Sequence, residues 1–428
     1  MADRKVFYSQ QRRGKNHLKS EELWTISQSN CKIVRLGIDL GMIERQLKDK
    51  IIQSSQQYPV VAILGPRQSG KTTLVRQAFP DAQYLNLEEP DTRLFAQKDP
   101  RAFLSGLGNQ VILDEVQRVP DLLSYLQVKV DQEKTLGRFI LTGSQHILLH
   151  EKISQTLAGR IVLFYLLPFS LDELSQAHIE ILDYQKFLFT GFYPPIYDRG
   201  LNPTEWLLNY SQTFIERELR LLTNITNLHS FSVFIRLCAG RIGQLLNLSA
   251  IANETGISVN TAKSWLSLLQ TSFIVFLLQP HHRNFNKRLV KMPKIYFYDT
   301  GLATALCGIS SQSQLTSHYL RGSLFENLII AELMKWQYNQ GRQPGLFFWR
   351  DKVGHEVDCI IESAVGLIPV EIKAGATVAD DFFKNLHYWQ KLDPLNNRSC
   401  YLIYGGDQPQ KRSIGQVLPW KQITDIFK

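Results

Sequence analysis

The stretch that decides the fold of this chain is Gly65-Pro66-Arg67-Gln68-Ser69-Gly70-Lys71-Thr72, which matches G-x-x-x-x-G-K-[ST] at every fixed position. Five apolar residues (60–64) precede it and predict a buried strand, and residues 73–79 follow it and predict a helix. In that context backbone N–H groups surround phosphates, the Lys71 ammonium contacts β/γ oxygens and the Thr72 hydroxyl ligates Mg²⁺. Residues Gly65 to Thr73 therefore predict a binding site for ATP or a close relative.

A second motif supports this prediction. The run Val111-Ile112-Leu113-Asp114-Glu115 is an apolar strand that ends in two carboxylates, as a Walker B element requires. We expect Asp114 to hold the Mg²⁺ shell and Glu115 to orient and activate the attacking water.

Residues 42–170 alternate between predicted strands and helices, which indicates a parallel sheet covered on both faces, with ligands at the carboxyl ends of its strands. Ser144 follows one such strand and is expected to sense the γ-phosphate. Arg160 opens the last strand, and two interpretations remain open for it. It reaches a nucleotide, in its own or a neighbouring subunit, or it pairs with a surface carboxylate.

Composition limits the class of protein. A chain of 428 residues implies two to four domains, and no apolar run reaches the roughly 20 residues of a membrane helix. Residues 1–41 are polar and basic, and they predict a disordered extension. The cysteines show no C-x-x-C spacing, which favours a reducing cytoplasm over a zinc site or disulfides (Cys31, Cys238, Cys307, Cys359 and Cys400).

The net charge of +9 is concentrated in the middle of the chain. Residues 236–295 hold eight Lys or Arg against one acid, a net charge of +7. Such a segment suggests a nucleic-acid-binding face.

The same segment carries a helix-turn-helix pattern. Ser249 and Ser258 are candidate helix caps, and Gly256 supplies the tight turn between the two helices. We expect a helical lid or linker over 171–235 and a winged helix over 236–300. Winged helices bind DNA but also serve as lids and protein-docking modules, so both alternatives stay open.

The C-terminal part, 301–428, combines charged residues in a further pattern. Glu326 lies on a predicted amphipathic helix, Asp358 on a strand, and Glu371 and Lys373 on the same face of a neighbouring strand. This is the arrangement of a restriction-endonuclease-like α/β domain, in which the three carboxylates could ligate Mg²⁺ and Lys373 could help activate a nucleophile. Taken singly, these residues are ordinary charges at strand ends.

Together, the order and spacing of these motifs resemble a family of prokaryotic AAA-superfamily ATP-binding proteins with a C-terminal endonuclease-like domain of unknown function. The resemblance covers the chain from Met42 to the end. It implies a P-loop NTPase fold of the ASCE/AAA type over 42–170, ATP binding and hydrolysis, and a cytoplasmic protein.

Three hypotheses follow. The first is an Mg²⁺-dependent ATPase that acts on or near DNA through the winged helix and the nuclease-like domain. The second is a nucleotide-controlled regulator whose nuclease-like domain is catalytically inactive. The third is a signalling switch that forms homo-oligomers without contacting DNA.

Overall fold

The computed structural model describes residues 42–144, 156–221, 228–282, 289–364, 366–392 and 400–427, and for residues 215–221 it describes the backbone alone. Residues 42–428 form one compact unit. The predicted extension 1–41 lies outside the described residues. Within the described part of the chain, no helix is long and apolar enough to cross a membrane.

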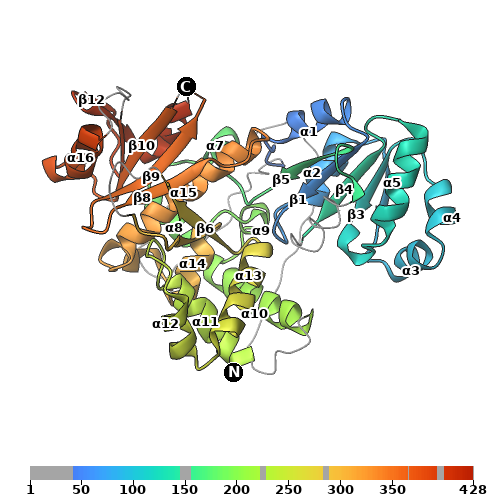
Figure 1. Cartoon of the computed structure of the whole chain (residues 1–428), viewed down its shortest axis with the longest axis horizontal. Coiled ribbons are helices and arrows are strands. Elements are labelled where there is room, and N and C mark those ends of the chain that lie inside the picture. The colour runs from blue at the N-terminus through green and yellow to red at the C-terminus, as the bar shows by residue number, and fades with distance from the viewer. Residues whose placement is uncertain are drawn as a thin grey trace, which may run out of the picture. The chain divides into compact units, whose positions relative to one another are not determined.

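The first half of the compact unit contains a five-stranded parallel sheet in the order β2-β3-β4-β1-β5 (Figure 1). Its strands are β1 (Val60–Leu64), β2 (Gln83–Asn86), β3 (Val111–Asp114), β4 (Phe139–Gly143) and β5 (Ile161–Tyr165). Because β4 lies between β1 and β3, the residues that follow these three strands meet at one edge. The parallel sheet predicted from the alternating pattern is confirmed.

Helices cover both faces of this sheet because alternate residues of each strand point to opposite sides. Val61 and Ile63 pack with Leu74 in one apolar cluster, whereas Val60 and Ala62 belong to a second cluster. The helices are α1 (Lys48–Ser55), α2 (Lys71–Ala78), α3 (Pro90–Lys98), α4 (Pro100–Ser105) and α5 (Leu122–Glu133). Pro100 begins α4 directly after α3, and the Asp99 carboxylate caps α4 by accepting from the Ala102 N–H at 3.0 Å.

The middle of the chain is helical, as predicted. Its helices are α7 (Leu171–Gln176), α8 (Tyr184–Thr190), α9 (Pro194–Asp198), α10 (Pro203–Leu221), α11 (Leu228–Ala239), α12 (Leu248–Thr255) and α13 (Val259–Thr271). Gly191, between α8 and α9, has φ +69° and lies against Asp299: a Cβ there would approach Asp299 Oδ1 to 2.4 Å. Only glycine fits this position without a shift of its neighbours.

The second half is built around an eight-stranded mixed sheet in the order β12-β13-β11-β10-β9-β8-β6-β7. Its strands are β6 (Val275–Pro280), β7 (Lys294–Phe297), β8 (Leu346–Arg350), β9 (Glu356–Ser363), β10 (Gly366–Lys373), β11 (Cys400–Tyr404), β12 (Gln410–Arg412) and β13 (Gly415–Pro419). The helices here are α14 (Thr300–Leu306), α15 (Arg321–Asn339) and α16 (Lys384–Leu392).

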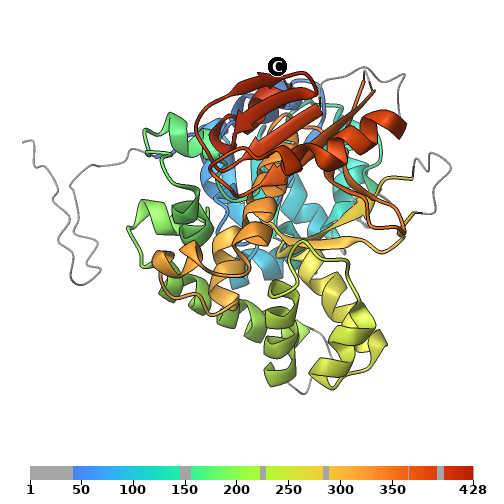
Figure 2. The same ribbon diagram turned by 90° about the vertical axis from the view of Figure 1, so that its left-hand side faces the viewer.

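Strand β6 joins the two predicted C-terminal domains. It pairs with β7 in an antiparallel hairpin and with β8 in parallel, through Gln279 opposite Phe347 (Figure 2). The segments 236–300 and 301–428, predicted as separate domains, therefore share one sheet.

Candidate functional site

The phosphate-binding loop connects β1 to α2 and turns through two residues with positive φ, Gln68 at 62° and Gly70 at 89°. Lys71 Nζ donates to the carbonyls of Gly65 (3.0 Å) and Pro66 (2.7 Å). Burial lowers the pKa of Lys71 to about 8, although the carboxylates of Glu115 and Asp114 oppose that shift. A cation held this far from water gains most from an anionic partner.

Two further observations fit a phosphate at this loop. Ser69 Oγ is buried and has no hydrogen-bond partner among the described residues, which leaves it for a ligand oxygen to satisfy. A Cβ on Gly65 would lie 2.1 Å from the Leu166 carbonyl oxygen, so the loop begins where only glycine allows the two backbones to approach.

Asp114 lies beside the loop, at the end of β3. Its Oδ2 accepts from the Thr72 hydroxyl at 2.8 Å and from the Tyr84 hydroxyl at 2.6 Å, and Thr142 donates to Oδ1. Burial and the Asp114 carboxylate raise the pKa of Tyr84, so this phenol stays a donor. The donor set of Thr72 and Asp114 fits Mg²⁺ bound together with phosphate oxygens.

Glu115 follows directly and has left-handed backbone angles, φ 58° and ψ 47°. Non-glycine residues are held in this region only where the surrounding structure fixes them. Its Oε2 accepts from Ser144 Oγ at 3.0 Å and from Gln117 Nε2. The structure thus brings Glu115 and Ser144 together, as expected of residues that follow β3 and β4, and it adds Gln117, which no sequence motif indicated.

Arg45 also reaches the loop, and no motif marked it. This buried guanidinium donates to the Ser69 carbonyl at 2.7 Å and the Leu167 carbonyl at 2.6 Å, and it pairs with Glu173 at 3.0 Å. Its planar group also lies over the Phe169 ring, 5.0 Å from the centroid.

A small cavity adjoins the loop and the first turns of α2. Gly70 and Thr73 line it at the start of α2. Residues that precede α1 or follow β5 line the rest, including Ile43, Phe169, Pro194 and Asp198.

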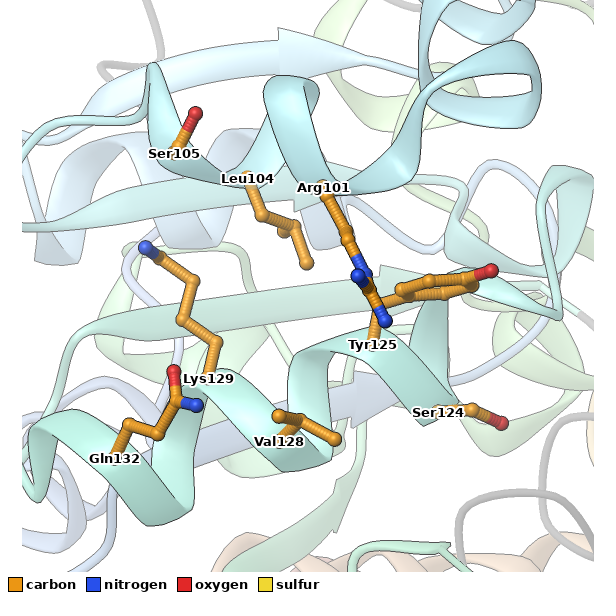
Figure 3. Close-up of a pocket in the computed structure, with 8 residues that line it drawn as sticks. All are labelled: Arg101, Leu104, Ser105, Ser124, Tyr125, Val128, Lys129 and Gln132. Carbon is orange, nitrogen blue, oxygen red and sulfur yellow. The ribbon is translucent and has the colours of Figure 1, made fainter.

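A larger pocket lies between α4 and α5. Arg101 and Leu104 of α4 point toward Tyr125 and Val128 of α5 (Figure 3). No residue of the phosphate-binding loop and neither Asp114 nor Glu115 lines it, so it is not the nucleotide site.

Arg160 does not lie near the loop of its own chain. Its carbonyl accepts from the Val60 N–H at 3.2 Å, at the start of β1, whereas the loop follows the opposite end of that strand. Its guanidinium pairs with Asp131 of α5 on the surface. The interpretation of Arg160 as a residue that reaches the nucleotide in its own subunit is therefore wrong. Arg160 lies at the start of β5, at the edge of the sheet opposite to the phosphate-binding loop.

In the C-terminal sheet, three of the predicted residues meet. Lys373 Nζ lies 2.6 Å from Glu371 Oε1 and 3.2 Å from Asp358 Oδ2. Asn385 of α16 donates to the same Glu371 oxygen at 3.0 Å. Burial and the Asp358 charge raise the pKa of Glu371 to about 8, and Glu371 Oε2 is buried with no partner among the described residues.

The fourth predicted residue, Glu326, has different partners. It accepts from Lys294 Nζ at 3.0 Å and from the Tyr296 hydroxyl, and Lys294 also pairs with Glu356. Within the described ranges, no group of three or more His, Cys, Asp or Glu side chains is arranged to hold a metal ion. The predicted three-carboxylate metal site is therefore not assembled, because lysines lie between or beside its carboxylates.

The positive charge of 236–295 is smaller at the surface than the sequence suggests. Lys294 is 2% exposed and balanced by two carboxylates from outside the segment, and Arg241 pairs with Glu254. Arg236, Lys263 and Lys291 are exposed. Arg283, Lys287 and Arg288 lie outside the described residues.

Comparison with family models divides the chain into three parts. Residues 57–175 match a model described as an AAA domain. Residues 181–313 and 321–423 match two domains of unknown function, DUF8612 and DUF4143. The AAA match contains the phosphate-binding loop, Asp114, Glu115 and Ser144.

Similar proteins include the uncharacterized protein Rv2008c of Mycobacterium tuberculosis, which is 30% identical over 79% of this chain and 76% of that protein. An uncharacterized protein of Haemophilus influenzae is 22% identical over 70% of this chain and 80% of that protein. Among solved structures, a Walker-type ATPase of Pyrococcus abyssi matches with a TM-score of 0.41 and 18% identity, covering 62% of this chain and 96% of that chain. AMPPCP-bound DnaA from Aquifex aeolicus matches with a TM-score of 0.28 and 13% identity, covering 52% of this chain and 85% of that chain. The chain belongs to the family of the mycobacterial protein Rv2008c, and its residues 57–175 match an AAA domain.

Proposed function

We propose that this protein hydrolyses ATP with Mg²⁺ and acts on or near DNA through a winged helix and a nuclease-like domain. The observation that carries the ATPase part is the contact between Thr72 and Asp114, with Glu115 next to them. Mg²⁺, when bound, neutralises the charge that develops on the β/γ oxygens. Thr72 and Asp114 would hold it, Lys71 would bind the phosphates, and Glu115 would orient the water.

The test is nucleotide binding and turnover in three variants. Lys71→Ala should abolish ATP binding or sharply weaken it, whereas Glu115→Gln should keep binding and stop hydrolysis. Lys98→Ala, an exposed lysine at the end of α3, is the matched control and should behave as the wild type. Unchanged turnover in Glu115→Gln would place the base elsewhere.

The DNA part is supported by the order of elements 228–297. Helices α11, α12 and α13 precede the hairpin β6–β7, and Leu245 forms an isolated bridge with Lys294, at the place where a winged helix would have its short third strand. The exposed side of α13 carries Asn260, Lys263 and Ser264, which offer phosphate and base contacts. Fluorescence anisotropy with duplex DNA at two salt concentrations should show salt-sensitive binding that Lys263→Ala weakens and Lys98→Ala does not.

The nuclease-like part is supported by the order α15, β8, β9, β10, α16, β11 and by the meeting of Asp358, Glu371 and Lys373. A second candidate function is a nucleotide-controlled switch in which this domain is catalytically inactive. The position of Lys373 between both carboxylates favours that candidate. Cleavage of plasmid DNA with Mg²⁺ or Mn²⁺, abolished by Asp358→Ala, would support a nuclease, and no cleavage by the wild type would support the switch.

A further inference from the structure

Arg45 contacts the phosphate-binding loop through a main-chain atom, the carbonyl oxygen of Ser69. Its Nη1 donates to the Ser69 carbonyl at 2.7 Å. Because the peptide bond is planar and trans, the Ser69 carbonyl and the Gly70 N–H point in opposite directions. The hydrogen bond that draws the carbonyl toward Arg45 therefore turns the Gly70 N–H away from Arg45.

Arg45 is itself fixed by residues 166–173, here called the strap. Leu167 accepts from Arg45 Nη2 at 2.6 Å, and Glu173, which is fully buried, accepts from Arg45 Nε at 3.0 Å. Glu173 also completes a capping box with Ser170 at the start of α7. All three donor groups of Arg45 thus have partners, and its position is determined by the strap.

The strap is held on its other side by α15. Glu332 accepts from the Leu171 N–H at 2.7 Å, and Lys335 donates to the Phe169 carbonyl at 2.8 Å. These two side chains pair with each other at 2.7 Å and are 3% and 1% exposed. Removing one partner of a buried ion pair leaves an uncompensated charge and is strongly destabilising.

We propose that Arg45 is a positioning residue that directs the Gly70 amide at the nucleotide phosphates, and that Glu332 and Lys335 support it through the strap. This inference rests on the proposed function, because it needs a nucleotide on the loop. Through these contacts, nucleotide affinity would depend on α15, a helix of the C-terminal part that also carries Glu326.

The test is the affinity of the full-length protein for ADP and ATP, measured by isothermal titration calorimetry. Arg45→Lys keeps the charge but loses the planar fork of donors, so affinity should fall on the order of tenfold, the effect of one charge-assisted hydrogen bond. Arg138→Lys, which changes a partly buried arginine just before β4 that pairs with Glu133, is the matched control and should leave affinity unchanged.

A purely structural role predicts a different result. In that case Arg45→Lys would lower the melting temperature of the nucleotide-free protein while the affinity of the folded protein stays as in the wild type. Should Arg45→Lys fail to fold, Glu173→Gln replaces it. The glutamine oxygen can still accept from the Ser170 N–H of the capping box, but its NH2 group is a donor and cannot accept from Arg45 Nε.

The contribution of α15 is tested by the double variant Glu332→Gln with Lys335→Met, which removes both charges of the buried pair. We expect a loss of ADP affinity of about threefold to tenfold, smaller than or equal to that of Arg45→Lys. Wild-type affinity in Arg45→Lys, together with lost binding in Lys71→Ala, would overturn the positioning role and leave the nucleotide site intact. Equal binding by the wild type and Lys71→Ala would instead overturn the proposed function.

Discussion

The Ser144 hydroxyl donates to Glu115 Oε2 at 3.0 Å and joins the residue after β4 to the residue after β3. Gln117 Nε2 contacts both partners, at 2.9 Å from Ser144 Oγ. The carboxylate that is proposed to orient the attacking water is therefore held by two neutral side chains.

Loss of either side chain should slow hydrolysis. In Ser144→Ala and Gln117→Ala we expect kcat to fall on the order of tenfold to a hundredfold with little change in KM, because a misplaced base affects the transition state more than binding. Steady-state kinetics with ATP measures both constants. An increase in kcat would show instead that these residues restrain Glu115 in a resting position.

Arg160 provides a test of assembly. Since it lies at the far edge of the sheet from its own loop, a catalytic role requires a neighbouring subunit. Arg160→Ala should then lose at least about a hundredfold in activity, and mixing it with inactive Lys71→Ala should restore part of that activity, because mixed assemblies contain complete sites. Full activity in Arg160→Ala alone would exclude this role, and Asp131→Ala, which removes only its surface partner, is the control.

Gly191 and Gly308 form a matched pair for a stability test. Both have positive φ, 69° and 77°, but only a Cβ on Gly191 meets a neighbour, Asp299 Oδ1 at 2.4 Å. Gly308→Ala should lower the free energy of unfolding by about 1–2 kcal/mol through backbone strain alone. Gly191→Ala should cost at least about 3 kcal/mol, since overpacking adds to the strain, and urea unfolding measures the difference. Equal losses would mean that Asp299 moves aside freely.

Asp351 should make stability depend on pH. Burial raises the pKa of this carboxyl, but hydrogen bonds from His355 and the Gly354 N–H outweigh burial and hold the pKa below its ordinary value. Tyr388 also donates to it at 3.3 Å. A depressed carboxyl pKa stabilises the folded state above the pKa of the unfolded chain, and that stabilisation is lost as the pH falls below about 4.

The matching variant is Asp351→Asn. At pH 6 we expect it to be less stable than the wild type by about 1–3 kcal/mol, and the gap should narrow as the pH falls below 4. Urea unfolding at pH 6 and at pH 3.5 checks this. If the difference in the free energy of unfolding stays constant with pH, the effect of the substitution does not come from the carboxylate charge.

Local patterns were enough to predict the phosphate-binding loop and the polar residues Asp114, Glu115 and Ser144 at the ends of β3 and β4. The loop, the apolar strand before Asp114 and the polar residue Ser144 are each fixed by a few adjacent residues, and parallel pairing brings strand ends together at one edge. The same reasoning, applied to Arg160 at the start of its strand, already places it at the opposite edge.

Contacts between distant segments could not be predicted in this way. Arg45 meets Ser69 and Glu173 across 24 and 128 residues, and its own segment carries no motif. From the sequence, Lys294 was included in the positive charge expected at the surface. In the structure its side chain is buried and forms ion pairs with Glu326 and Glu356. Whether a charged side chain is exposed or neutralised depends on its tertiary partners. These partners lie far away in the sequence, so local patterns do not reveal them.

The pairing of β6 with β8 has a consequence for how the chain can be divided. A protein that ends after β7 would leave β6 with an unpaired edge, and a protein that begins at α15 would expose the backbone of β8 in the same way. Open strand edges recruit other chains and promote aggregation. The two halves of this sheet are therefore expected to be soluble only when they are expressed together.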